Sequence, residues 1–440
     1  MGGGRPRGIG SSTAPTRAKK RSEHLHFAPK HRKKRRLPIR AIAFVVILLV
    51  ILLGAAVVKA SVAADPKLSV QVVMPARVLL AGTAPHPAWP AVGEAAVEVE
   101  GLPPLGSSGG STPVPLASLA KVMTAYVLLK DHPLAVGQPG FTVTITAAQE
   151  ADYHQRLAQA ESVVPVTAGE QITELQLMQG LLVPSGNNVA ELLADFDAGS
   201  DSAFVARMNA TAAALGMDHT HYTDPAGLDS TTVSTASDQL VLAAKAMANP
   251  VFAQIVAMPS VILPVAGLVT NFNSAVGKNG YVGIKTGSDS SSGGCLMFAN
   301  QRAIAGHTVT ILGVVLGQDP GGTHTQSLID AAVAASDQLI ASVAAGISTR
   351  TVVPAGRVVA RIANREGRTV DVVTSSALTQ LGYGGESIGV SVRMDPVGTS
   401  LRAGQAVGHV GAPGVGPTTP LVASAALPTV SLGWKLLHEY

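Results

Sequence analysis

Residues 116–130 have the sequence Leu-Ala-Ser-Leu-Ala-Lys-Val-Met-Thr-Ala-Tyr-Val-Leu-Leu-Lys. Good helix formers with an apolar face, preceded by Pro115 as a start signal, predict a helix here. Ser118 and Lys121 are three residues apart, so a hydroxyl and an amine lie on one face at the start of that helix. The free N–H groups of a helix N-terminus also stabilise developing negative charge. The pattern suits a nucleophile and its base, although such a pair also occurs on ordinary helix surfaces.

Two further short motifs follow along the chain. Ser185-Gly186-Asn187 comes directly after Pro184, where the chain must leave a helix and can push a hydroxyl and an amide into a cleft. Lys285-Thr286-Gly287 ends a β-like run and supplies a cation, a hydroxyl and a residue small enough for a substrate backbone to approach. Each motif alone is common, but their order and their spacings of 67 and 100 residues are specific.

Together the motifs SxxK, SxN and KTG resemble those of the penicillin-recognising acyl-serine transferases. In detail they resemble the low-molecular-mass D-alanyl-D-alanine carboxypeptidases of peptidase family S11, over roughly residues 76–345. Further similar blocks lie at 184–188, 224–229, 234–238 and 283–287. The β-rich tail, with 401–408, resembles more loosely the accessory domain that often follows in that family.

The resemblance implies a role for each motif residue. Ser118 would attack the carbonyl of the penultimate D-alanine, with Lys121 as a proton acceptor whose pKa is lowered by burial and by Lys285. Ser185 would relay a proton to the leaving D-alanine, and Asn187 would hold the substrate amide. Lys285 and Thr286 would bind the terminal carboxylate of the substrate, with Gly287 beside them as a further substrate-binding residue. The N–H groups of Ser288 and Ser118 would together form an oxyanion hole.

The implied function is removal of the terminal D-alanine from peptidoglycan stem pentapeptides through an acyl-serine, with β-lactams as covalent inhibitors. Ala120 departs from the usual Thr, 288–292 is unusually Ser-rich, and the Gly/Ser-rich surface loop 104–112 resembles an insertion. Two alternatives remain. A β-lactamase would need a Glu that activates water, and none stands between Glu191 and Glu366. A catalytically silent peptidoglycan-binding or regulatory module would not need the intact motifs. Water or an amine could be the acyl acceptor.

The amino-terminal residues indicate a membrane anchor. Residues 1–40 carry 13 Lys and Arg against one acid, which leaves 19 basic and 27 acidic residues for the rest of the chain. The basic run directly precedes 41–58, an uncharged apolar stretch of the length that spans a bilayer. Basic flanks stay cytoplasmic, so we expect a single-pass protein of a bacterial cell membrane with its body extracellular or periplasmic, and no nucleic acid as partner. Cleavage of a signal peptide near Ala64 is the alternative.

The expected fold class is α+β. A penicillin-binding, β-lactamase-like domain would have an antiparallel sheet with helices on both faces and a helical subdomain, followed by a small all-β domain. The expected parts are 1–40 as a disordered basic cytoplasmic tail, 41–58 as a transmembrane helix, 59–75 as a linker, 76–345 as the catalytic domain and 350–440 as the β domain. Predicted strands cover 281–285, 295–299 and 308–317, and a closing helix covers 327–344.

No cofactor or metal is expected. The lone Cys295 lies in an apolar run that predicts a buried strand, so we interpret it as a core residue. His219 and His221 have no accompanying set of metal ligands, and the HExxH pattern is absent from the sequence. Residues 106–110 formally match G-x-S-x-G, but the flanking sequence does not predict the strand and helix that a nucleophile elbow requires.

Overall fold

The computed structural model describes residues 38–319, 321, 324–412 and 418–438. The helices are α1 (Ile39–Val62), the short 3₁₀ helix η1 (Ala117–Leu119), α2 (Ala120–Asp131), α3 (Ala147–Ala158), α4 (Glu174–Leu182), α5 (Asn187–Ala198), α6 (Asp201–Ala214), α7 (Ala236–Met247), α8 (Pro250–Val256), α9 (Thr325–Gly346) and α10 (Leu432–Leu437). The described residues divide into two compact units, Pro66–Thr429 and a smaller unit that contains α1 and α10.

The strands are short in most places and longest in one central sheet. They are β1 (Ser69–Val72), β2 (Arg77–Leu79), β3 (Glu94–Val99), β4 (Ser107–Ser108), β5 (Val114–Pro115), β6 (Thr142–Thr144), β7 (Gln171–Thr173), β8 (Val233–Ser234), β9 (Ser260–Leu263), β10 (Gly267–Thr270), β11 (Tyr281–Asp289), β12 (Gly293–Ile304), β13 (His307–Gln318), β14 (Ser348–Val353), β15 (Val358–Ala363), β16 (Thr369–Thr374), β17 (Leu378–Gly382), β18 (Ser387–Gly389), β19 (Ser391–Met394), β20 (Ala406–Gly411) and β21 (Thr418–Ala423).

The central sheet has the order β11-β12-β13-β3-β4, and neighbouring strands are antiparallel. Its first three strands confirm the meander predicted from the sequence, although each is longer than expected. Strand β4 belongs to the stretch 104–112 that we interpreted as a surface loop. It pairs with β3, so part of this stretch closes the edge of the sheet.

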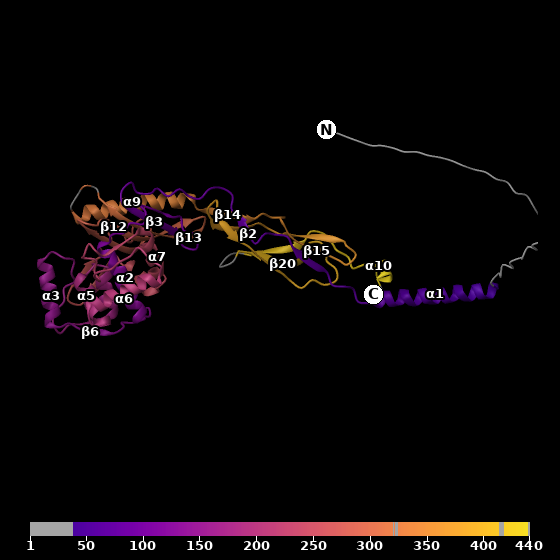
Figure 1. The fold of residues 1–440 in the computed structure, drawn as a ribbon, viewed down its shortest axis with the longest axis horizontal. Coiled ribbons are helices and arrows are strands. Elements are labelled where there is room, and N and C mark those ends of the chain that lie inside the picture. Colours follow the sequence, from indigo (N-terminus) through magenta and orange to yellow (C-terminus); the bar gives the residue numbers. More distant parts are fainter. Residues whose placement is uncertain (1–37, 320, 322–323, 413–417, 439–440) are drawn as a thin grey trace, which may run out of the picture. The chain divides into compact units, whose positions relative to one another are not determined.

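Apolar side chains cover both faces of this sheet. Along β12, Cys295 and Met297 lie in the core cluster that includes α2, α4 and α7, whereas Leu296 and Phe298 lie in the cluster that includes α9. Burial on both faces explains why these strands are almost continuously hydrophobic. Figure 1 shows α9 along one side of the sheet, with the other helices of this domain on the opposite side. The expected arrangement with helices on both faces is confirmed.

The helical subdomain positions the second motif. Thr173 caps α4 by accepting from the N–H of Gln176, whose side chain in turn accepts from the N–H of Thr173, which together form a capping box. Helix α4 ends at Leu182, and after a break of four residues α5 begins at Asn187. The break therefore places Ser185 between two helices that are both packed into the core.

The β-rich part has its own apolar core and a sheet of order β1-β15-β16-β21-β20-β19. Strand β1 lies in the stretch 59–75 that we expected to be a linker, and it pairs with β15. Strand β2 pairs with β18 in the same way. The main domain therefore does not begin at 76. The pairing partners are about 300 residues away along the chain, a separation that local patterns do not reveal.

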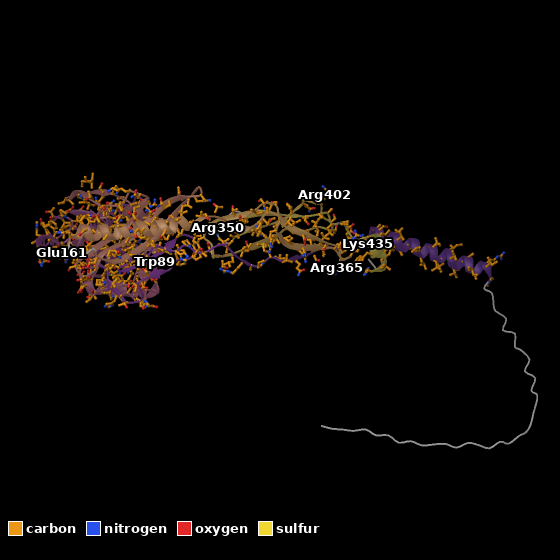
Figure 2. All side chains as sticks on the ribbon, turned by 90° about the horizontal axis from the view of Figure 1, so that it is seen from above. Trp89, Glu161, Arg350, Arg365, Arg402 and Lys435 are labelled. Atoms are coloured by element: carbon orange, nitrogen blue, oxygen red, sulfur yellow. The ribbon has the colours of Figure 1, made fainter. Side chains whose placement is uncertain are left out.

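The apolar helix α1 has a mean hydropathy of 3.3 over its best window, and none of that window is buried. Figure 2 shows side chains projecting along the helix, of which Ala60 near the end of α1 is buried. It is longer at both ends than the predicted 41–58. Helix α9 also meets the length and composition criteria for a membrane span, but it packs on the central sheet. The predicted cytoplasmic tail lies outside the described residues, apart from 38–40.

Candidate active site

A cleft with a volume of about 260 Å³ brings the predicted motifs together. It lies where η1, the α4–α5 break and β11 meet. Of the predicted site residues, Lys121 and Lys285 are buried next to the cleft rather than lining it. The predicted residues that line it are Ser118, Ser185, Asn187, Thr286, Gly287 and Ser288.

Ser118 and Lys121 form the centre of the site. Lys121 has no exposed surface, and its Nζ lies 2.8 Å from Ser118 Oγ and 2.9 Å from the Ala226 carbonyl oxygen. Burial lowers the pKa of Lys121 to about 7, although the nearby carboxylates of Asp224 and Glu161 act in the opposite direction. A large fraction of Lys121 is therefore neutral near neutral pH and able to accept the hydroxyl proton.

Lys285 is the second buried amine. It is 1% exposed, and its Nζ donates to the carbonyl oxygen of Thr286 at 3.0 Å. Its pKa is well below the ordinary value, first because of burial and second because of repulsion by Lys121. Repulsion between the two buried amines acts on both, so it disfavours the state in which Lys121 and Lys285 are charged together. An anion bound at Lys285 would favour its charged form.

Ser185 has a strained backbone and a free hydroxyl. Its φ of +65° lies in the left-handed region, which is unfavourable for a residue with a Cβ. Its Oγ is buried and has no hydrogen-bond partner among the described residues. A Cβ at Gly186 would lie 2.8 Å from a methyl of Val164, so this position is tightly packed. The break is thus fixed by packing, with a hydroxyl available toward the cleft.

Gly287 allows β11 to lie against the turn that carries Ser118. A Cβ here would lie 2.9 Å from the carbonyl oxygen of Leu116 and 3.0 Å from the nitrogen of Ser118. We expected the small residue to make room for a substrate backbone. The structure adds a requirement within the protein itself, because β11 must approach the Ser118 turn closely.

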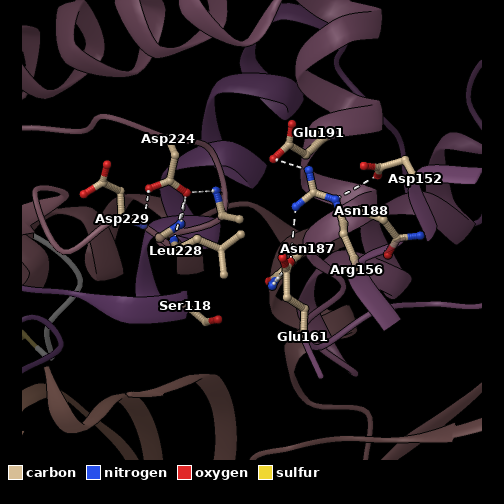
Figure 3. Close-up of polar contacts among 12 residues, drawn as sticks. Ser118, Asp152, Arg156, Glu161, Asn187, Asn188, Glu191, Asp224, Leu228 and Asp229 are labelled. Atoms are coloured by element: carbon tan, nitrogen blue, oxygen red, sulfur yellow. Dashed lines mark hydrogen bonds and ion pairs between the residues drawn. The ribbon is translucent and has the colours of Figure 1, made fainter. Parts of the chain in front are cut away.

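An aspartate that we did not single out from the sequence organises the loop beside Lys121. Asp224 accepts hydrogen bonds from the N–H groups of Ala226, Gly227, Leu228 and Asp229, and one from the Thr232 hydroxyl. Figure 3 shows this carboxylate with its fan of backbone donors. The loop carries the Ala226 carbonyl to Lys121. The similar block 224–229 drew attention to this stretch, but nothing in the sequence assigned Asp224 this structural position.

A second unforeseen group lies at the other end of the cleft. Glu161 lines it and accepts from Asn187 Nδ2 at 2.9 Å, and it forms an ion pair with Arg156. Arg156 also contacts Asp152 and Glu191, as Figure 3 shows. These residues are not contiguous, so only the fold reveals the network.

The isolated candidates of the sequence do not belong to this site. Cys295 is fully buried in β12, as expected of a core residue. His219 and His221 are exposed. The backbone N–H of His219 donates to the Asp238 carboxylate, and that of His221 donates to the Val233 carbonyl oxygen. Ser107 and Ser108 form β4, and Ser108 is followed by no helix. The G-x-S-x-G match is therefore not a nucleophile elbow.

Comparisons with known proteins agree with this geometry. The family described as D-alanyl-D-alanine carboxypeptidase matches residues 105–319. A D-alanyl-D-alanine carboxypeptidase of Mycobacterium tuberculosis is 39% identical over 188 residues, which are 42% of this chain and 60% of that protein. A D-alanyl-D-alanine carboxypeptidase of a Streptomyces species is 31% identical over 216 residues, which are 45% of this chain and 71% of that protein. The chain thus spans less than two thirds of the first relative.

Solved structures also match. The crystal structure of the Streptomyces K15 DD-transpeptidase matches with a TM-score of 0.50 and 27% identity, covering 60% of this chain and all of that one. A peptidoglycan synthesis regulatory factor from Streptococcus pneumoniae matches with a TM-score of 0.54 and 22% identity, covering 77% of this chain and 99% of that one. The second match shows likeness of fold alone, and its coverage extends that likeness beyond the main domain.

Proposed function

The chain belongs to the D-alanyl-D-alanine carboxypeptidase family, peptidase family S11, and from this premise we propose that it removes the terminal D-alanine of peptidoglycan stem pentapeptides. The observation that carries the proposal is the contact of 2.8 Å between a buried amine and the Ser118 hydroxyl. A hydroxyl is a weak nucleophile unless an adjacent base removes its proton. Lys121, with a pKa of about 7, is such a base.

The reaction has two halves. The Ser118 oxygen attacks the carbonyl carbon of the penultimate D-alanine while its proton passes to Lys121. The N–H groups of Ser118 and Ser288 receive the oxyanion. The peptide bond then breaks, the leaving D-alanine takes a proton through the Ser185 hydroxyl, and the acyl-enzyme is hydrolysed by water with regeneration of both side chains. Ser185 suits this relay because its Oγ is uncommitted among the described residues.

The terminal carboxylate of the substrate binds at Lys285 and Thr286. Lys285 is buried and close enough to Lys121 for mutual repulsion. A substrate carboxylate supplies the opposite charge and restores the protonated form of the amine. A β-lactam carries an equivalent carboxylate, so it is held in the same way and opened by Ser118.

The two alternatives are less well supported. A β-lactamase needs a carboxylate that activates water. The carboxylates among the described cleft residues are Glu161, bound to Arg156 and Asn187, and Asp289, which accepts from the N–H groups of Ser291 and Ser292. A silent module would not require a buried amine with a lowered pKa, which is costly to stability.

Helix α1 is the feature that supports a location for the protein. We propose that α1 anchors the protein in the cytoplasmic membrane, with the amino terminus inside and the peptidase outside, where peptidoglycan and β-lactams are met. The basic residues before α1 support this orientation.

Labelling with a fluorescent penicillin tests the proposal. The full chain in detergent should form a covalent adduct that maps to Ser118, and Ser118→Ala should form none. Ser202→Ala, which removes an exposed hydroxyl on α6, is the matched control and should label normally. An adduct that persists in Ser118→Ala would rule out the proposed nucleophile.

A further inference from the structure

We propose that Glu161 is a positioning residue, which holds the Asn187 amide in one orientation so that its oxygen faces the substrate. This inference rests on the proposed function, because it concerns the same cleft. It adds a residue outside the three motifs that determines how the acyl part of the substrate is held.

The orientation follows from hydrogen-bond chemistry. An ionised carboxylate only accepts, so the Asn187 group 2.9 Å from Glu161 Oε2 must be the NH₂ group. Asn187 Oδ1 then points away from Glu161. It is buried and has no partner among the described residues, and Asn187 lines the cleft. An N–H group of the substrate amide is the partner that this oxygen lacks.

Without Glu161 the amide would have little reason to keep this orientation. The terminal torsion of an asparagine side chain is broad and roughly two-fold, so the oxygen and the NH₂ group exchange places easily. The flipped amide would present N–H donors to a substrate N–H group. A single acceptor in the right place therefore converts a mobile amide into a fixed one.

Glu161 is itself held in place from two sides. The N–H of Asn187 donates to the carbonyl oxygen of Ser162 at 2.7 Å, which joins the Glu161 loop to the start of α5. Arg156 contacts Glu161 at 3.2 Å and Glu191 at 3.0 Å, and Glu191 lies one turn after Asn187 on α5. Figure 3 shows Arg156 between these carboxylates, with Glu161 beside Asn187. The carboxylate and the amide are thus fixed to the same helix.

Glu161 also acts on the base through its charge. The charged groups that influence Lys121 are Asp224, Glu161 and Glu191, which raise its pKa, and Arg156, which lowers it. Lys285 is the other amine buried nearby. Removal of the Glu161 charge therefore lowers the pKa of Lys121, which gives a readout that a loss of packing alone would not give.

The first test is Glu161→Gln. A glutamine can accept from or donate to Asn187, so either amide orientation becomes possible. The second-order rate of penicillin acylation should fall about tenfold, as expected for loss of a hydrogen bond to a charged group. The acidic limb of its pH profile should move to lower pH. Glu150→Gln on α3, whose partners are Thr167 and Ala168 outside the cleft, is the matched control and should match the wild type.

An exchange of the two groups gives the sharper test. Asn187→Asp alone places two carboxylates side by side and should lose acylation and thermal stability. In the double variant Glu161→Gln with Asn187→Asp, the glutamine donates to the new carboxylate, which again presents an acceptor to the substrate. Acylation should recover at least about tenfold over Asn187→Asp. This comparison stays valid if Glu161→Gln folds poorly.

The outcomes separate this inference from the proposed function. Unchanged acylation in Glu161→Gln, or no recovery in the double variant, overturns the positioning role even if Ser118 carries the adduct. Labelling that does not depend on Ser118 overturns the proposed function instead. A fall in Glu161→Gln together with recovery in the exchanged pair supports the inference.

Discussion

The Lys121 amine lies 2.8 Å from the Ser118 hydroxyl in a place where Lys121 has no exposed surface. Burial lowers the pKa of Lys121 to about 7. The burial that makes Lys121 a base for Ser118 also lowers the stability of the fold, because a buried amine costs free energy whether it is charged or neutral. Functional sites commonly show this conflict between activity and stability.

The acylation rate should increase with pH through about 7, because only the neutral form of Lys121 accepts a proton and its pKa is about 7. The measurement is the rate of penicillin acylation from about pH 5 to 9, which should show this increase in the wild type. A profile that is flat across neutral pH would contradict the assignment of Lys121 as the base.

Lys121→Met should abolish acylation and raise the free energy of unfolding by about 1–3 kcal/mol at neutral pH. The pKa of Lys121 is about 7 in the folded protein, against an ordinary value of 10.5. Between these values the unfolded chain binds more protons, so this group makes the wild type more stable as pH rises. Chemical denaturation at pH 7 and 9 should show this increase in the wild type and less of it in Lys121→Met. An equal increase in both would contradict the account.

Asp224→Asn should reduce both stability and acylation. The carboxylate accepts from four backbone N–H groups and the Thr232 hydroxyl, and an amide cannot accept all of them. We expect a loss of about 1–3 kcal/mol in the free energy of unfolding. Because the charge of Asp224 raises the pKa of Lys121, the acidic limb of acylation should move to lower pH. Asp229→Asn, which affects an exposed partner of Thr231, is the control.

Lys285→Ala should reduce kcat/KM for a peptide with a free terminal carboxylate by roughly 10²–10³, the scale of a charge-assisted contact. Penicillin acylation should fall in parallel, because a β-lactam carries the equivalent carboxylate. A peptide with an amidated terminus should be a poor substrate of the wild type and little affected by the substitution. Equal losses for acid and amide peptides would instead place Lys285 in the proton-transfer chemistry.

Much of the site could be predicted because its chemistry lies in short local motifs. The spacing of Ser118 and Lys121 is a property of one helix turn, and Pro184 forces the break that carries Ser185. That the three motifs share one cleft was implied by their order and spacing and by the resemblance to the family, and not by any motif on its own.

The remaining features depend on contacts between distant parts of the chain. Glu161 and Asn187 are 26 residues apart in the sequence, and no local sequence pattern at either position predicts their contact. The β domain shows the same limit. The apolar alternation from Ile388 to Met394 divides into two strands, β18 and β19, which pair with β2 and β20. Strand pairing at such separations is set by packing that a local pattern does not encode.

The topology can be tested on intact cells that lack an outer barrier. Protease added to spheroplasts should digest the peptidase and leave a fragment before α1, because the basic residues that precede α1 favour the cytoplasmic side. A body that stays protected until the membrane is permeabilised would show the opposite orientation.

The central claim is that Ser118 opens a D-alanyl-D-alanine bond. The most direct measurement is release of D-alanine from a stem pentapeptide by the full chain in detergent, with Ser118→Ala in parallel. The account predicts steady release by the wild type and none by Ser118→Ala. Release that continues in Ser118→Ala, or a wild type that binds penicillin covalently but frees no D-alanine, would contradict it.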